Sequence, residues 1–273
     1  MSFKTDFDAF INQSWQQHEA EPELVYNQLE HALGEVEDAN HAERILPLML
    51  HTSVGHLNDP KQFITSLDKL ENGVATECLA RQRAKSVAQY FFDGSDTGMA
   101  LLAEVDQRRV FAQIANELSA MNKLQQASEW LTKAVSGLNS GSVAEPLARS
   151  IAITGNNLAC QYEELSERTA TQIQHMLEAA ALALEYWKVA GGWMQEERAE
   201  YRLAMSLLKA GEPKKAKIHA ERCEEICQHN GGDAFELFCA NDLLMLVHYH
   251  LSQINKQQLG LDMQQYCVNS TLA

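Results

Sequence analysis

The chain lacks the sequence patterns that mark secreted, membrane-spanning and disulfide-linked proteins. Its 273 residues contain no run near the roughly 18 apolar residues that a membrane-spanning helix needs. The first residues show no basic stretch followed by an apolar core, so we expect no secretory signal. None of the six cysteines forms a C-x-x-C pair. We therefore expect reduced thiols and a cytoplasmic protein.

Residues that interrupt helices are also scarce. The sequence has only five prolines and fourteen glycines, and runs of β-branched residues are rare. Alanine, leucine, glutamate and glutamine, which favour helices, dominate instead. The composition predicts an all-α fold.

The sequence lacks the motifs that mark several classes of enzyme. It contains no glycine-rich phosphate loop, no H-E-x-x-H motif and no G-x-S-x-G motif, so we expect no enzyme and no cofactor. The net charge is −15, and residues 1–43 carry ten carboxylates against a single base, Lys4. Because an acidic surface repels phosphate backbones and anionic lipids, we expect no nucleic-acid partner and no membrane partner.

Small residues recur at matched positions in three segments, each flanked by larger apolar residues. This pattern indicates two helices that touch closely at alanines, and its repetition indicates stacked helical hairpins, or an α-solenoid. The segments are Ile114-Ala115-x-x-Leu118 with Ala127 and Leu131, Leu158-Ala159-x-x-Tyr162 with Ala180 and Leu184, and Leu203-Ala204-x-x-Leu207 with Ala216 and Ala220.

At these residues the chain resembles the tetratricopeptide repeat family. The segment 201–228 carries the family's spacing at Leu203, Ala204, Leu207, Gly211, Ala216, Ala220 and Cys223. The alanines Ala115, Ala159 and Ala204 stand 44 and 45 residues apart, against about 34 in the standard unit, which indicates a long-helix variant. The resemblance implies a right-handed superhelix of antiparallel hairpins whose concave groove binds a peptide or protein.

We predict a single elongated helical-repeat domain over residues 1–273. An uninterrupted helix is expected from Met99 to about Met121, and another from Phe235 to Leu251. The predicted parts are divergent N-terminal helices in 1–98, clear hairpins in 99–251 and a C-terminal capping helix in 252–273.

The resemblance also implies which side chains face a partner, namely those on first helices that do not occupy packing positions. An asparagine amide can bridge the donors and acceptors of an extended peptide, and an arginine can bind a carboxylate. The expected partner-binding residues are Arg109, Asn116, Asn157, Arg198, Tyr201 and Asn241.

One group of cysteines and histidines could indicate a zinc site, because thiolate and imidazole are common ligands of that ion. Cys223 and Cys239 occupy packing positions, however, and His248 and His250 point to different sides of a helix. We therefore interpret the group as core cysteines and surface histidines, and expect no metal site. Its members are Cys223, Cys227, His229, Cys239, His248 and His250.

Together these features favour a scaffold that binds a protein or peptide. Two alternatives remain open. The chain could be a structural protein that pairs with a second copy through its end hairpins, or a fragment of a ligand-sensing regulator.

Overall fold

The computed structural model is helical throughout the part of the chain that it describes. It describes residues 6–36, 38–68 and 78–271, with side chains as far as residue 257. No strand occurs within these ranges. The all-α prediction is confirmed.

The chain divides into two compact units, Met1–Asn139 and Ser140–Ala273. The boundary falls inside the glycine- and serine-rich segment 137–142. A single elongated domain was predicted, and we describe each unit by itself.

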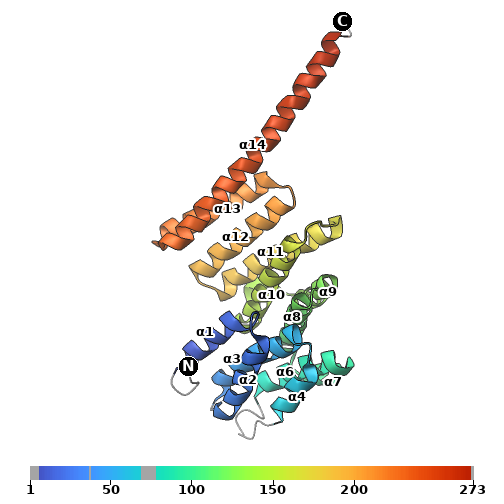
Figure 1. Ribbon diagram of the computed structural model, residues 1–273, viewed down its shortest axis with the longest axis vertical. Coiled ribbons are helices and arrows are strands. Elements are labelled where there is room, and N and C mark those ends of the chain that lie inside the picture. Colours follow the sequence, from blue (N-terminus) through green and yellow to red (C-terminus); the bar gives the residue numbers. More distant parts are fainter. Residues whose placement is uncertain (1–5, 37, 69–77, 272–273) are drawn as a thin grey trace. The chain divides into compact units, whose positions relative to one another are not determined.

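The first unit consists of short helices, most of them ten to twenty residues long (Figure 1). In chain order they are α1 (Phe7–Gln17), α2 (Pro22–Ala32), η1 (Leu33–Glu35), α3 (Ala39–Leu50), η2 (His51–His56), α4 (Pro60–Leu67), α6 (Leu79–Asp93), α7 (Thr97–Ala100), α8 (Glu104–Ala120) and α9 (Leu124–Val135).

An aspartate occupies the N-cap position of three of these helices. Its carboxylate stabilises the helix because it accepts a hydrogen bond from an otherwise unpaired backbone N–H of the first turn. Asp6 caps α1, Asp38 caps α3, and Asp59 caps α4 with Pro60 in the first turn.

The predicted continuous helix from Met99 to Met121 is wrong. Helix α7 ends at Ala100 and α8 begins at Glu104, with Ala103 in an extended conformation between them. Leu101 in this break is 84% exposed, so the apolar spacing that suggested a helix includes a side chain that is not in the core.

The second unit is a series of longer helices in which each helix packs on the next (Figure 1). Helix α12 also contacts α10 and α14, two positions away in either direction. The elements are η3 (Ser140–Ser142), α10 (Glu145–Glu164), α11 (Ala170–Ala190), α12 (Trp193–Lys209), α13 (Pro213–His229) and α14 (Ala234–Thr271).

Helix α14 differs in length from the prediction. A helix over 235–251 and a separate capping helix over 252–273 were expected, whereas α14 is a single helix of 38 residues. The large apolar residues of the predicted capping helix, Leu259, Leu261 and Tyr266, lie outside the described side chains.

The recurring small residues are packing positions, as predicted. Ala115, Ala159 and Ala204 are completely buried, as is Ala240 at the corresponding place in α14. Helices α10 and α11 also approach closely, at Gly155. A Cβ atom added to Gly155 would lie 2.7 Å from the carbonyl oxygen of Ala179.

The substitution Gly155→Ala tests how close this contact is. Alanine is favoured over glycine in a helix by about 1 kcal/mol. The added methyl group would instead push against the backbone of α11, so we expect a net loss of about 1–3 kcal/mol in the free energy of unfolding. Urea denaturation measures it. The control Gly34→Ala adds a methyl group with nothing within 4 Å and should not destabilise the protein. Equal behaviour of the two variants would contradict the close contact.

Candidate functional site

The predicted partner-binding residues fall in both units. Arg109 and Asn116 lie on α8 of the first unit, and the other four lie on α10, α12 and α14 of the second. They therefore form two sets, each of which has its own surroundings.

Arg109 and Asn116 are already engaged by other parts of the first unit. The Arg109 guanidinium donates to Glu43 of α3 at 3.0 Å. Glu43 also pairs with the buried Arg83 of α6, so Arg109 belongs to an ion-pair network within the unit. The Asn116 Nδ2 atom lies 3.3 Å from Nδ1 of His51. Neither residue projects from the surface as an open binding group.

In the second unit, Arg198 and Asn241 are exposed but also have partners. The Arg198 side chain, 59% exposed, pairs with the buried carboxylate of Glu236 and so links α12 to α14. The Asn241 amide donates to the carbonyl of Leu237 in its own helix at 2.7 Å. Tyr201 is half-buried, and Asn157 is exposed on α10. These residues lie on α10, α12 and α14, and α12 contacts both of the other helices.

Beside Arg198 lies a buried acid that the sequence did not reveal. Glu197 is 1% exposed, and both of its carboxylate oxygens are buried close to the carboxylate of Glu236. Burial, together with the nearby carboxylate of Glu236, raises the pKa of Glu197 to about 7. The folded protein therefore holds a proton on Glu197 at pH values where the unfolded chain has lost it.

This shift predicts a pH-dependent stability. Because the pKa of Glu197 is higher in the folded state, its contribution is fully present below about pH 4.5 and is lost as pH rises through 7. The substitution Glu197→Gln removes the charge. Relative to this variant, the wild type should lose on the order of 2–3 kcal/mol between pH 4.5 and 8.

Urea denaturation at the two pH values measures this difference. The control Glu185→Gln changes an exposed carboxylate on α11 and should leave the wild-type pH dependence in place. If the Glu197→Gln variant and the wild type lose stability in parallel, the raised pKa is contradicted.

Two of the three cysteines considered for zinc, Cys223 and Cys227, are buried, and the third, Cys239, is half-buried. Cys223 and Cys227 are completely buried in α13, and the Cys223 thiol donates to the Glu197 carbonyl. Burial raises the pKa of Cys223 and brings that of Cys227 to about 11. Both thiols therefore stay protonated at neutral pH, which disfavours metal binding.

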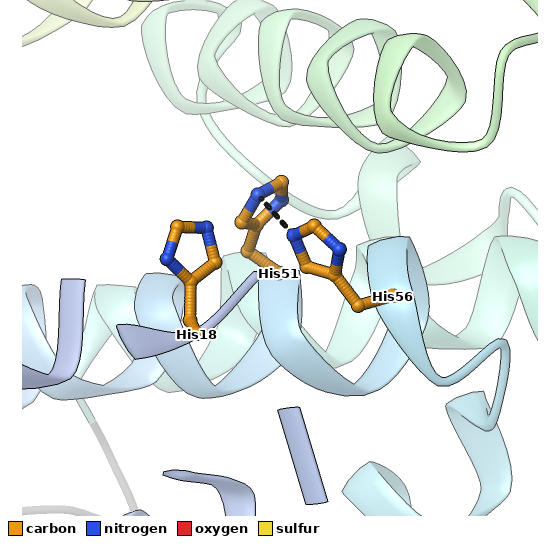
Figure 2. A group of neighbouring side chains, drawn as sticks. All are labelled: His18, His51 and His56. Carbon is orange, nitrogen blue, oxygen red and sulfur yellow. Dashed lines mark hydrogen bonds between the residues drawn. The ribbon is translucent and has the colours of Figure 1, made fainter. Parts of the chain in front are cut away.

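Three histidines gather instead in the first unit. His18 follows the last residue of α1, and His51 and His56 are the two ends of η2. Each offers a ring nitrogen, and these three atoms all lie within 4.8 Å of one another. Figure 2 shows the three rings on the same side of η2. Among the described residues, no other group of three such ligands comes this close together.

The shape of η2 brings His51 and His56 together. This segment is a π-helix, in which the backbone N–H bonds five residues back, as Leu57 does to Thr52 at 3.0 Å. Residues five apart then lie nearly above each other, whereas in an α-helix they diverge. The Nε2 atoms of His51 and His56 are 3.3 Å apart. Single π-helical turns occur frequently at functional sites.

Two of the rings are held through their Nδ1 atoms. His51 Nδ1 donates to Oε2 of Glu117 at 2.6 Å, and His18 Nδ1 donates to the backbone carbonyl of Trp15 at 2.6 Å. Glu117 is completely buried in α8, and its other oxygen accepts a bond from Gln113 at 2.6 Å. These bonds place the second ring nitrogen, Nε2, towards the middle of the cluster.

The environment sets the charge of each ring. Burial lowers the pKa of His18. Burial and the neighbouring imidazoles of His51 and His18 lower the pKa of His56 to about 4. Burial also acts to lower the pKa of His51, but the Glu117 carboxylate outweighs it and raises that pKa. His18 and His56 are therefore neutral at pH 7.

The sequence contained a single sign of this cluster. His51 stands where the hairpin pattern has alanine, in Leu50-His51-x-x-Val54. A histidine at a close helix contact needs extra space and a polar partner. The polar partner lies far away in the sequence, because Glu117 is 66 residues from His51.

Comparison with protein-family models, with curated proteins and with solved structures gave no match to this chain. Within the described residues, no helix has the length and hydropathy required to cross a membrane. Functional conclusions therefore rest on the chain's own residues.

Proposed function

We propose that this chain is a helical-repeat scaffold of the tetratricopeptide type that binds an amphipathic helix of another protein along α14. The observation that carries this proposal is a row of exposed apolar side chains on α14. This row, the α14 stripe, consists of Phe235, Phe238, Met245 and Tyr249.

The α14 stripe is exposed although its residues are large and apolar. Its four side chains are between 59% and 69% exposed. The opposite face of α14 is buried at Ala240, Leu243 and Val247, where the helix packs on α13 and α12. Several large apolar side chains exposed on one face of a helix are typical of binding sites, since isolated soluble proteins rarely expose large apolar patches.

A helix is the partner that this stripe fits best. The stripe residues follow a helical spacing on a rigid helix, which is the arrangement that an amphipathic partner helix recognises. Within the second unit, α12 contacts four other helices, whereas α14 packs on α13 and α12. A partner helix would add the next helix to this series.

The charge of the chain favours a different protein over a second copy. The exposed Asp242 lies within the stripe, and the whole chain carries −15. Two copies would bring like charges together, whereas a partner helix with basic residues beside its apolar face would complement Asp242. Pairing of two copies, the alternative considered from the sequence, is thus the weaker proposal.

Replacing two residues of the α14 stripe with aspartate tests the proposal. The variant Phe238→Asp/Met245→Asp should weaken partner binding at least ~100-fold, since each lost apolar contact contributes roughly 1.5–3 kcal/mol. A photo-crosslinking side chain placed at Tyr249 identifies the bound segment in an extract of the source cells by mass spectrometry. We expect a peptide with helical apolar spacing and basic residues.

The matched control is Ile218→Asp on α13, which adds a charge at another exposed apolar residue. It should leave capture unchanged. Capture that survives in the double variant contradicts the α14 stripe as the binding surface. A crosslink from Tyr249 to a second copy of the chain, with a dimer in light scattering, contradicts the partner proposed here and supports self-assembly.

A further inference from the structure

The histidine cluster of the first unit has ligand atoms of a defined kind. His18 and His51 each use Nδ1 as a hydrogen-bond donor, to Trp15 and Glu117. In a neutral imidazole the other nitrogen, Nε2, then carries a lone pair. A neutral imidazole nitrogen is the form that binds transition-metal ions, and imidazole suits zinc, copper, iron and nickel.

The distances suit a tetrahedral ion. Zinc binds imidazole nitrogen at 2.0–2.1 Å, which places two ligand atoms of a tetrahedron about 3.3 Å apart. The Nε2 atoms of His51 and His56 are 3.3 Å apart before any ion is added. Since all three ligand atoms lie within 4.8 Å, the third needs to close by no more than about 1.5 Å. A rotation of the imidazole ring supplies such a movement.

The hydrogen bonds that His18 and His51 donate match those of histidines that bind metal ions. A ligating imidazole usually donates its other N–H to a carboxylate or backbone carbonyl, which fixes the orientation of the ring. His51 donates to the buried Glu117, and Gln113 in turn holds that carboxylate. His18 donates to a carbonyl of its own helix.

The backbone leaves room for this arrangement at Gly55. A Cβ atom there would lie 2.8 Å from Glu117 Oε2 and 3.1 Å from His51 Nδ1. Any larger residue would therefore displace the hydrogen bond that orients His51. Glycine in the π-helical segment is thus required by the cluster.

From this geometry we propose that His18, His51 and His56 bind one divalent transition-metal ion of the zinc class through their Nε2 atoms. The ion replaces the hydrogen bond between His51 and His56, and it joins the end of α1 to η2. Three imidazoles leave the fourth tetrahedral position to water. Solvent reaches the cluster beside His56, which is half-buried, and beside Trp15, which is 41% exposed. This proposal is independent of partner binding by α14.

Titration of the metal-free, tag-free chain with Co²⁺ and then Zn²⁺ tests the site. We expect one equivalent of Co²⁺ to give visible absorption bands of a tetrahedral ion, and one equivalent of Zn²⁺ to abolish them. Because the Trp15 ring lies 5.2 Å from His18 and 5.9 Å from His51, Co²⁺ should also quench its fluorescence. The variant Trp15→Phe should lose that quenching and retain the absorption bands.

Single substitutions then assign the ligands. His56→Ala and His18→Ala should each weaken Zn²⁺ binding at least ~100-fold, and Gly55→Ala should weaken it ~10–100-fold by disturbing the Glu117 contact. The control His31→Ala removes an exposed histidine of α2 in the same unit and should bind as wild type. His51→Ala is less informative, because it also leaves the buried Glu117 without this partner.

Two results would overturn the proposal. One is the absence of saturable Zn²⁺ uptake by the folded wild type below ~100 µM. The other is uptake that His56→Ala and His18→Ala leave unchanged, which would place the ion elsewhere on this acidic chain. Circular dichroism of each variant shows whether it has folded. Should one of the two histidine variants not fold, the other still decides the assignment.

Discussion

Close contacts between helices, at positions that hold only alanine or glycine, constrain the rest of the structure. Ala115, Ala159 and Ala204 are completely buried, and Gly155 lies against the backbone of α11. A larger side chain at such a position separates two backbones, because protein interiors are closely packed. These contacts determine which face of each helix is buried and hence which face is left for other functions.

Much of this packing could be predicted from sequence, because it depends on local spacing. The small residues and the Asp59–Pro60 helix start obey rules that act within a few residues. The break before Glu104 and the π-helical shape of η2 do not follow from such local rules. They depend on how the segment fits its neighbours, and η2 packs against α8, which follows it by about fifty residues. Spacing alone therefore gave a single helix where the structure has α7 and α8.

The predicted binding residues show the same limit. The pattern placed Arg109 and Arg198 away from the packing positions, which left them available to a ligand. The structure supplies each with an acid from another helix, Glu43 for Arg109 and Glu236 for Arg198. Sequence spacing alone cannot predict ion pairs between helices, and it did not predict that Glu197 is buried. The exposed apolar face of α14 could not be predicted either, because it depends on which face of the helix packs on α12 and α13.

His51 is the place where the packing rule is broken. A large polar ring occupies a position that holds alanine elsewhere, and the structure accommodates it with a glycine, a π-helical turn and a buried carboxylate. Such a departure from local consistency often marks a functional site. We propose that these features serve to bind a metal ion through three histidines.

Anomalous X-ray diffraction at the zinc absorption edge tests this claim most directly. A crystal of the chain grown with one equivalent of Zn²⁺ should give a single strong peak about 2.0–2.1 Å from the Nε2 atoms of His18, His51 and His56. A crystal with no peak there, in which His51 and His56 keep their hydrogen bond, would contradict the account.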